Sequence, residues 1–253
     1  MTNKIGGYPI TTVVKNLIII NFLFFIATDL LDVFFTSRVG APYNSLRNLF
    51  GLYYFDTSLF KPFQIATSMF THSGPLHFGL NMLTLFFLGP MIEHTLGSKK
   101  FLTLYLFSGI GASVVHTLAN YFEVSSIMGQ MDAESIAFVQ EKGYEVIRSG
   151  KNYSNELLGS LNSALHIYAV GASGCISGVL MALGMLYPNV ELYFMFIPAP
   201  IKARTIAIVS VIGSLVFGIL NLSSDPIAHF AHLGGLIFGY LILRFWNKAY
   251  LLK

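Results

Sequence analysis

The sequence has 253 residues, of which 54% are hydrophobic and only 11% charged, and its mean hydropathy is +0.65. Soluble domains carry about a quarter of charged residues, so this composition excludes an ordinary soluble protein and predicts a membrane protein with several spans in the lipid bilayer. The formal net charge of +3 is scattered between apolar runs. Because no basic patch with interleaved aromatic residues occurs, we expect no nucleic-acid partner.

Six apolar segments are long enough to cross a bilayer, which requires about 20 predominantly apolar residues. They cover about residues 13–34, 76–96, 101–121, 168–187, 204–222 and 229–247. The first is expected to be a retained span rather than a signal peptide, because Asp29 and Asp32 directly follow its apolar run from Leu17 to Ala27 and no clear small-residue cleavage site occurs. The second begins after Pro75, a residue suited to a first helical turn. Only residues 97–100 separate it from the third, which predicts an antiparallel hairpin.

Six spans place both termini on one side of the membrane, and the Lys and Arg residues indicate which side. With a cytoplasmic N-terminus, nine of the fifteen basic residues are cytoplasmic and six lie in the outside segments, which are much longer. Positive charge accumulates in short cytoplasmic loops. We therefore expect cytoplasmic N- and C-termini, in the inner membrane of a bacterial cell.

Two of the outside segments are long. The first, about 35–75, is rich in aromatic residues and poor in charge, so we expect it to lie in the membrane interface. The second, about 122–167, carries six acidic residues and is the one soluble-looking part. Helical spacing there predicts a short amphipathic helix whose apolar positions are Ile136, Val139, Gly143, Val146 and Ile147. No linker divides the chain, so residues 1–253 are expected to form a single domain.

Polar side chains within the apolar segments need a reason, since a full charge there costs about 2.5 kcal/mol or more. His77 and Asn81 are four residues apart and therefore share one face of the second span. Ser173 lies within the small-residue stretch 171–178, which opens the fourth span. Such a stretch can serve helix packing alone, because small residues let membrane helices approach closely.

The sixth span carries His232 on the same helix face as Gly235 and Gly239. This nearly bare face can press against an equally bare partner, and the small residues of the fourth span provide one. Under the topology above, His77, Ser173 and His232 all lie toward the outside ends of their helices. We therefore expect them to meet.

Together these residues are the parts of acyl-transfer chemistry. Ser173 is the candidate nucleophile and His232 its general base, while His77 and Asn81 are candidate hydrogen-bond donors to an oxyanion. The acid nearest to His232 is Asp225, which belongs to the preceding loop. The sequence therefore predicts a Ser-His dyad without a carboxylate.

Two other chemistries fit the sequence less well. The candidate metal ligands are His72, His77, His229 and His232. No Asp, Glu or Cys joins them and the His-Glu-x-x-His pattern is absent, so we expect no metal. Cys175, the only cysteine, could be the nucleophile, but it lies about 200° around the helix from Ser173 and off the shared face. A single cysteine also excludes an intramolecular disulfide.

Four motifs follow one another along the chain. They are His72-x-x-x-x-His77-x-x-x-Asn81; Glu93-x-x-x-Gly97 with Phe101 and Tyr105; Gly171-Ala172-Ser173-Gly174; and Ala231-His232-x-x-Gly235-x-x-x-Gly239. In this order, and on membrane spans of this number, they make the chain resemble the rhomboid intramembrane serine proteases from about residue 60 to 239. Each motif alone is weak, whereas their joint occurrence is highly specific.

The resemblance implies an all-α membrane protein, a six-helix bundle with a cavity open to the non-cytoplasmic side. It implies that Ser173 attacks the peptide carbonyl and that His232 takes and returns the proton. His77, Asn81 and the backbone N–H of Ser173 would stabilise the oxyanion. The implied partners are the lipid bilayer and transmembrane protein substrates, cut in or near the membrane, and no metal or organic cofactor is expected.

The chain departs from the family pattern in two places. Many rhomboids carry a Trp-Arg pair in the first outside loop, but Trp246 is the only tryptophan here, so Tyr53 and Tyr54 are the candidate anchors of that loop. Many also carry an aromatic residue one turn after the nucleophile, where the catalytic histidine stacks. That position is Ser177, a candidate hydrogen-bond partner of His232.

Two alternative functions stay open on the sequence alone. The first is a catalytically silent rhomboid-like protein that binds membrane helices, which is favoured only if the dyad is broken; here both of its residues are present. The second is a small transporter or channel with a histidine-lined cavity, whose substrate flux would survive Ser173→Ala.

Overall fold

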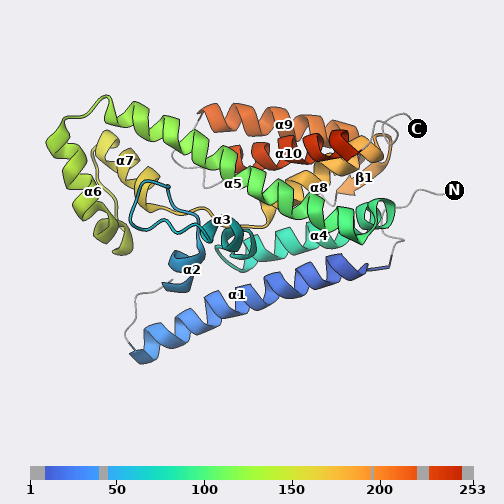
Figure 1. Cartoon of the computed structure of the whole chain (residues 1–253), viewed down its shortest axis with the longest axis horizontal. Helices are drawn as coiled ribbons and strands as arrows, with labels where there is room; N and C mark the ends of the chain where they lie inside the picture. Colours follow the sequence, from blue (N-terminus) through green and yellow to red (C-terminus); the bar gives the residue numbers. More distant parts are fainter. Residues whose placement is uncertain (1–8, 40–44, 195–196, 221–227, 247–253) are drawn as a thin grey trace.

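A computed structural model describes residues 9–39, 45–194, 197–220 and 228–246. Long helices lie side by side in a bundle, and a smaller helical unit extends from one end of it (Figure 1). The bundle helices are α1 (Thr12–Val39), α4 (Pro75–Leu96), α5 (Ser98–Met128), α8 (Ser173–Leu186), α9 (Ala203–Leu220) and α10 (His229–Trp246). The ends of the predicted spans 204–222 and 229–247 lie outside the described residues.

Four helices of the described chain are long and apolar enough to cross a membrane. Their qualifying segments are Thr12–Asp29, Pro75–Leu96, Ser98–Met128 and Ala203–Leu220. With 14 residues, α8 is about 21 Å long, shorter than the roughly 30 Å of a bilayer's hydrocarbon core. The structure thus agrees with a protein of several spans, while the count of six stays a prediction.

The predicted hairpin of the second and third spans is confirmed, because α4 ends at Leu96 and α5 begins at Ser98. The junction is stabilised by Glu93, whose side chain is 3% exposed. Its carboxylate accepts hydrogen bonds from the backbone N–H groups of Val13 (3.1 Å) and Val14 (3.0 Å), and from the hydroxyl of Ser98 (2.7 Å). The first N–H groups of a helix have no intrahelical acceptor. Glu93 therefore caps α1 from a neighbouring helix.

The fold of the described residues is all-helical, as predicted, except for two short strands that follow α8. Strands β1 (Glu191–Phe194) and β2 (Ile197–Lys202) pair antiparallel, with Glu191 opposite Lys202 and an irregularity between Leu192 and Phe194. Proline lacks a backbone N–H and disrupts helices. Pro188, Pro198 and Pro200 therefore keep this connection from forming a helix.

The first outside segment is built from short helices around one buried amide. The helices are α2 (Ser45–Phe50), α3 (Gln64–Thr67) and η1 (Ser68–Phe70). The side chain of Gln64 is 1% exposed. Its oxygen accepts from the N–H groups of Lys61 (3.1 Å) and Tyr53 (3.5 Å), and its nitrogen donates to the carbonyls of Leu49 (3.2 Å) and Leu59 (3.0 Å). The side chain of Gln64 thus joins four backbone positions of this loop, which has no Trp-Arg pair.

The two tyrosines predicted to anchor this loop are both buried, Tyr53 at 3% and Tyr54 at 6% exposure. The ring of Tyr53 meets that of Tyr168 edge-on at 5.4 Å. Next to it, Leu52 and Ala169 exchange two backbone hydrogen bonds of 2.9 Å. The loop is therefore attached to the segment that leads into α8.

The second outside segment holds α6 (Ala133–Arg148) and α7 (Glu156–His166). The amphipathic helix predicted there is confirmed as α6, which buries Val139 and Gly143. Together with the end of α5, these helices enclose a second apolar cluster that includes Tyr54, Val124, Ile127, Val139, Leu161, Ala164 and Leu165. Helix α7 was not predicted from the sequence, because its buried face includes the polar residues Asn162 and His166, which are joined by a 2.7 Å hydrogen bond.

Replacing Glu93 by glutamine should destabilise the bundle. The amide retains one acceptor oxygen and loses the charge, so we expect a loss of about 2 kcal/mol, the usual contribution of hydrogen bonds to a charged group. Thermal unfolding in detergent measures it. The matched control is Glu141→Gln, at an exposed position on α6. Equal midpoints for the two variants would contradict the capping role.

Candidate active site

Ser173 is the first residue of α8, so the helix starts five residues later than the prediction of 168. The delay has two causes. Ala169 is held in an extended bridge with Leu52, and Gly171 has a φ of 133°. The N–H of Gly171 donates to the carbonyl of Ser68 at 2.9 Å. These contacts stop the helix from forming earlier and place Ser173 at its N-terminus.

Gly171 allows the ring of His77 to approach the nucleophile segment. A φ of 133° belongs to the region that residues other than glycine rarely adopt. A Cβ at this position would also lie 2.7 Å from Cε1 and 2.8 Å from Nε2 of His77. The same point is 3.5 Å from the hydroxyl oxygen of Ser173. Glycine is therefore required here both by the backbone and by the space.

The hydroxyl of Ser173 and the imidazole of His232 are hydrogen-bonded, with 2.7 Å between Oγ and Nε2. Ser173 begins α8, and His232 lies in the first turn of α10. The two residues are 59 positions apart in the sequence. The geometry is that of a nucleophile paired with a general base. Asp225, the nearest acid in the sequence, lies outside the described residues.

This pairing depends on close contact between α8 and α10, which the sequence analysis predicted and the structure confirms. A Cβ on Gly235 would lie 2.0 Å from the carbonyl oxygen of Gly174. A Cβ on Gly239 would lie 2.7 Å from the Cα of Gly178. Both distances are too short for any real Cβ. The two backbones therefore touch along a surface without side chains.

Helix α5 joins the same contact, which the sequence analysis missed. A Cβ on Gly234 would lie 2.7 Å from the carbonyl oxygen of Gly111, and one on Gly174 would lie 2.5 Å from the Cβ of Ala112. Small residues at 109, 111 and 112 of the third span were the available signal. Helices α5, α8 and α10 thus form one tightly packed group beneath the site.

Of the two predicted oxyanion donors, the structure brings His77 to the nucleophile segment. Asn81 is one turn further along α4, 7% exposed, and its amide donates to the carbonyl of His77 at 2.8 Å. Asn81 therefore has one N–H committed within its own helix and one left for another acceptor.

In the part of the chain that the structure describes, the hydroxyl of Ser177 bonds within its own helix and makes no hydrogen bond to His232. Its hydroxyl donates to the carbonyl of Ser173, one turn back in α8, at 2.8 Å. A hydroxyl has a single proton, so this bond occupies its donor. The backbone N–H of His232 donates to the carbonyl of Ala228 at 3.2 Å, and its imidazole bonds the hydroxyl of Ser173.

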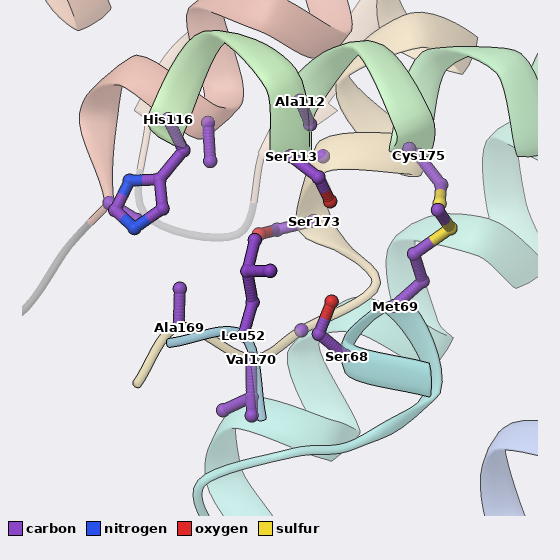
Figure 2. Close-up of a pocket in the computed structure, with 15 residues that line it drawn as sticks. Leu52, Ser68, Met69, Ala112, Ser113, His116, Ala169, Val170, Ser173 and Cys175 are labelled. Atoms are coloured by element: carbon purple, nitrogen blue, oxygen red, sulfur yellow. The ribbon is translucent and has the colours of Figure 1, made fainter. Parts of the chain in front are cut away.

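A cavity of about 40 Å³ adjoins Ser173. Figure 2 shows polar side chains around it, with Ser68 from η1, and Ser113 and His116 from α5. Leu52, Met69 and Cys175 supply apolar walls. One water needs roughly 10–15 Å³ of such space, so the cavity has room for water beside Ser173. Cys175 is fully buried in its wall.

The other two candidate metal ligands, His72 and His229, make contacts of other kinds. His72 is fully buried, and burial lowers its pKa to about 4, so it is neutral at ordinary pH. Its ring meets that of His77 edge-on at 5.3 Å. His229 stacks on Phe217. In the part of the chain that the structure describes, no three His, Cys, Asp or Glu side chains are arranged to hold a metal ion.

Comparisons with known proteins match these features. The family model described as Rhomboid domain matches residues 60–247. Rhomboid protease AarA of Providencia stuartii is 25% identical over 220 residues, which are 86% of this chain and 67% of that protein. RHOMBOID-like protein 12, mitochondrial, of Arabidopsis thaliana is 28% identical over 173 residues, 68% of this chain and 42% of that protein.

Rhomboid protein 1, mitochondrial, of Saccharomyces cerevisiae is 25% identical over 185 residues, which are 73% of this chain and 42% of that protein. The chain thus spans about two thirds of the length of the bacterial relative and well under half the length of the two mitochondrial ones.

Adding a methyl group at Gly235 should separate Ser173 from His232. We expect Gly235→Ala to lower the free energy of unfolding by about 1–3 kcal/mol, as overpacking does, and to slow labelling of Ser173 by a fluorophosphonate. The matched control is Gly213→Ala on α9, where a Cβ meets nothing within 4 Å. That variant should be as stable as the parent or more so. If Gly235→Ala labels at the parent's rate, the contact does not set the pairing.

Proposed function

The chain belongs to the rhomboid family, and on that premise we propose that it is an intramembrane serine endopeptidase. It would hydrolyse peptide bonds in or near the transmembrane segments of membrane proteins. The observation that carries the proposal is the 2.7 Å hydrogen bond between Ser173 Oγ and His232 Nε2, beside a cavity with room for water. A silent helix-binding protein would have no need of this pairing.

In the proposed reaction, Nε2 of His232 removes the proton of Ser173 while Oγ attacks the substrate carbonyl. The protonated imidazole then gives the proton to the leaving amine. The amine departs, and the acyl group remains on Oγ of Ser173 as an acyl-enzyme. Water from the cavity then attacks the acyl-enzyme, while His232 again removes and returns a proton, and the second product is released. The pair works without a carboxylate because the packing of α10 on α8 already orients the imidazole.

The oxyanion of the tetrahedral intermediate would be stabilised at the N-terminus of α8. The N–H of Ser173 belongs to the first turn, where N–H groups lack intrahelical acceptors and the helix dipole favours negative charge. His77 lies against Gly171 and can add a second donor, and the free N–H of Asn81 a third. Such pre-positioned donors typically contribute a factor of about 10²–10³ in rate.

The protein crosses the membrane several times, and we propose that its site faces the non-cytoplasmic side, with both termini in the cytoplasm. At 31 residues α5 is about 46 Å long, so it extends beyond the bilayer at one end and carries α6 and α7 there. Helix α8, at about 21 Å, would begin below the membrane surface. A substrate helix would have to unwind to present an extended bond to Ser173.

Replacing the nucleophile tests the proposal directly. Purified protein in liposomes should cut a single-pass membrane reporter, and Ser173→Ala should reduce the rate to background. Cys175→Ala is the matched control, because that buried thiol is two residues away in the same helix and is not the proposed nucleophile. Equal cleavage by the parent and Ser173→Ala would refute a serine mechanism. Flux of a small solute that survives Ser173→Ala would instead favour a transporter.

The rate should also depend on pH on the acid side. A general base must be neutral to accept a proton, so kcat should fall about tenfold for each pH unit below the pKa of His232 and level off above it. Cleavage measured across a pH series, with circular dichroism at each pH to monitor folding, gives the profile. A rate that stays constant until the protein unfolds in acid would exclude His232 as the base.

A further inference from the structure

Ser73 holds one nitrogen of the His77 ring from two directions. It lies just before α4, which begins at Pro75. Its hydroxyl oxygen is 2.9 Å from Nδ1 of His77, and its backbone nitrogen is 3.4 Å from the same atom. Both polar groups of a single residue therefore converge on one ring nitrogen.

These contacts decide where His77 carries its proton. A backbone N–H can only donate, so Nδ1 must present its lone pair. A neutral imidazole has one donor and one acceptor nitrogen, so the proton is on Nε2. The hydroxyl of Ser73, which can donate or accept, then also donates to Nδ1.

The protonated nitrogen faces the nucleophile segment. Nε2 is 2.8 Å from the point where a Cβ of Gly171 would stand, and that point is 3.5 Å from Oγ of Ser173. With the proton on Nε2, the ring can donate to an oxyanion formed there. With the proton on Nδ1, the lone pair of Nε2 would face the oxyanion and repel it.

Ser73 is itself fixed from outside the helix. Arg47 of α2, 7% exposed, donates to the carbonyl of Ser73 at 3.3 Å and forms an ion pair with Asp29 of α1. The buried ring of His72 packs edge-on against His77 and restricts its rotation. The loop before α4 is therefore held by contacts with residues outside that helix.

We propose that Ser73 is a positioning residue, which selects the tautomer of His77 that can stabilise the oxyanion. The proposal deepens the proposed protease function and rests on it for the role of His77. Ser73 acts through His77 and does not itself touch the reacting atoms. Ser73 is at an unspecified position of the motif that contains His77 and Asn81. Its contact is with the ring nitrogen of His77 that faces away from the site.

The first test reads the tautomer without catalysis. Nitrogen-15 spectra of histidine-labelled protein in detergent, with the His77 signals identified by their loss in His77→Gln, distinguish a protonated from an unprotonated nitrogen. The parent should show a proton on Nε2. Ser73→Ala loses the 2.9 Å hydroxyl contact and keeps only the longer backbone contact of 3.4 Å, so part of its His77 should carry the proton on Nδ1. A parent with its proton on Nδ1 overturns the proposal.

The second test reads the rate. Ser73→Ala should lower kcat about two- to tenfold, the effect of one hydrogen bond, with KM unchanged, because the oxyanion exists only on the reaction path. Ser73→Thr, which keeps the hydroxyl, should restore most of kcat. The control is Thr84→Ala on α4, the helix of His77, where the Thr84 hydroxyl donates to the carbonyl of Leu80 in its own helix.

A double variant separates positioning from general support. In a His77→Ala background, Ser73→Ala should cause no further loss of kcat, because its effect is transmitted through the ring. An equal loss in both backgrounds overturns the proposal. If the parent cuts no reporter while the spectra place the proton on Nε2, the protease assignment fails and the tautomer assignment stands.

Discussion

The contact between α8 and α10 is the constraint on which the rest of the site depends. Two rows of glycine let the helix backbones touch, with Gly235 against Gly174 and Gly239 against Gly178. Without side chains between them, the first turns of both helices converge, and the hydroxyl of one reaches the imidazole of the other. Bulk at any of these positions would leave each helix intact and still separate the pair. The contact of α8 with α10 therefore sets the distance between Ser173 and His232.

The segment before α8 is restrained from several sides, which explains how a short helix can begin in the middle of a bundle. Leu52 pairs with Ala169, and the loop that carries Leu52 is tied together by the amide of Gln64. This amide satisfies backbone groups that would otherwise be unpaired when buried.

The unit formed by α6 and α7 is part of the same arrangement. Its apolar cluster takes in Tyr54 from the first outside loop, and α7 ends at His166, a few residues before the nucleophile. Asn162 and His166 are buried on α7 and bonded to each other, and they pack against Gly143 of α6. A Cβ on Gly143 would lie 2.1 Å from the amide oxygen of Asn162. The added unit therefore supports the segment that leads to the nucleophile, as well as covering the end of α5.

The sequence by itself determined the membrane character, the hairpin of α4 and α5, the amphipathic α6 and the pairing of the α8 and α10 glycine faces. These follow from hydrophobicity, helical period and residue size, which are local properties. Only the tertiary structure decided that α8 starts at Ser173, that two strands follow it, that α5 shares the glycine contact and that Ser177 bonds its own helix. The start of α8 and the contact of α5 depend on partners distant in the sequence, Leu52 for Ala169 and Gly111 for Gly234, which local patterns do not specify. The bond of Ser177 is local, but its hydroxyl had two candidate partners, and only the folded structure shows which one it bonds.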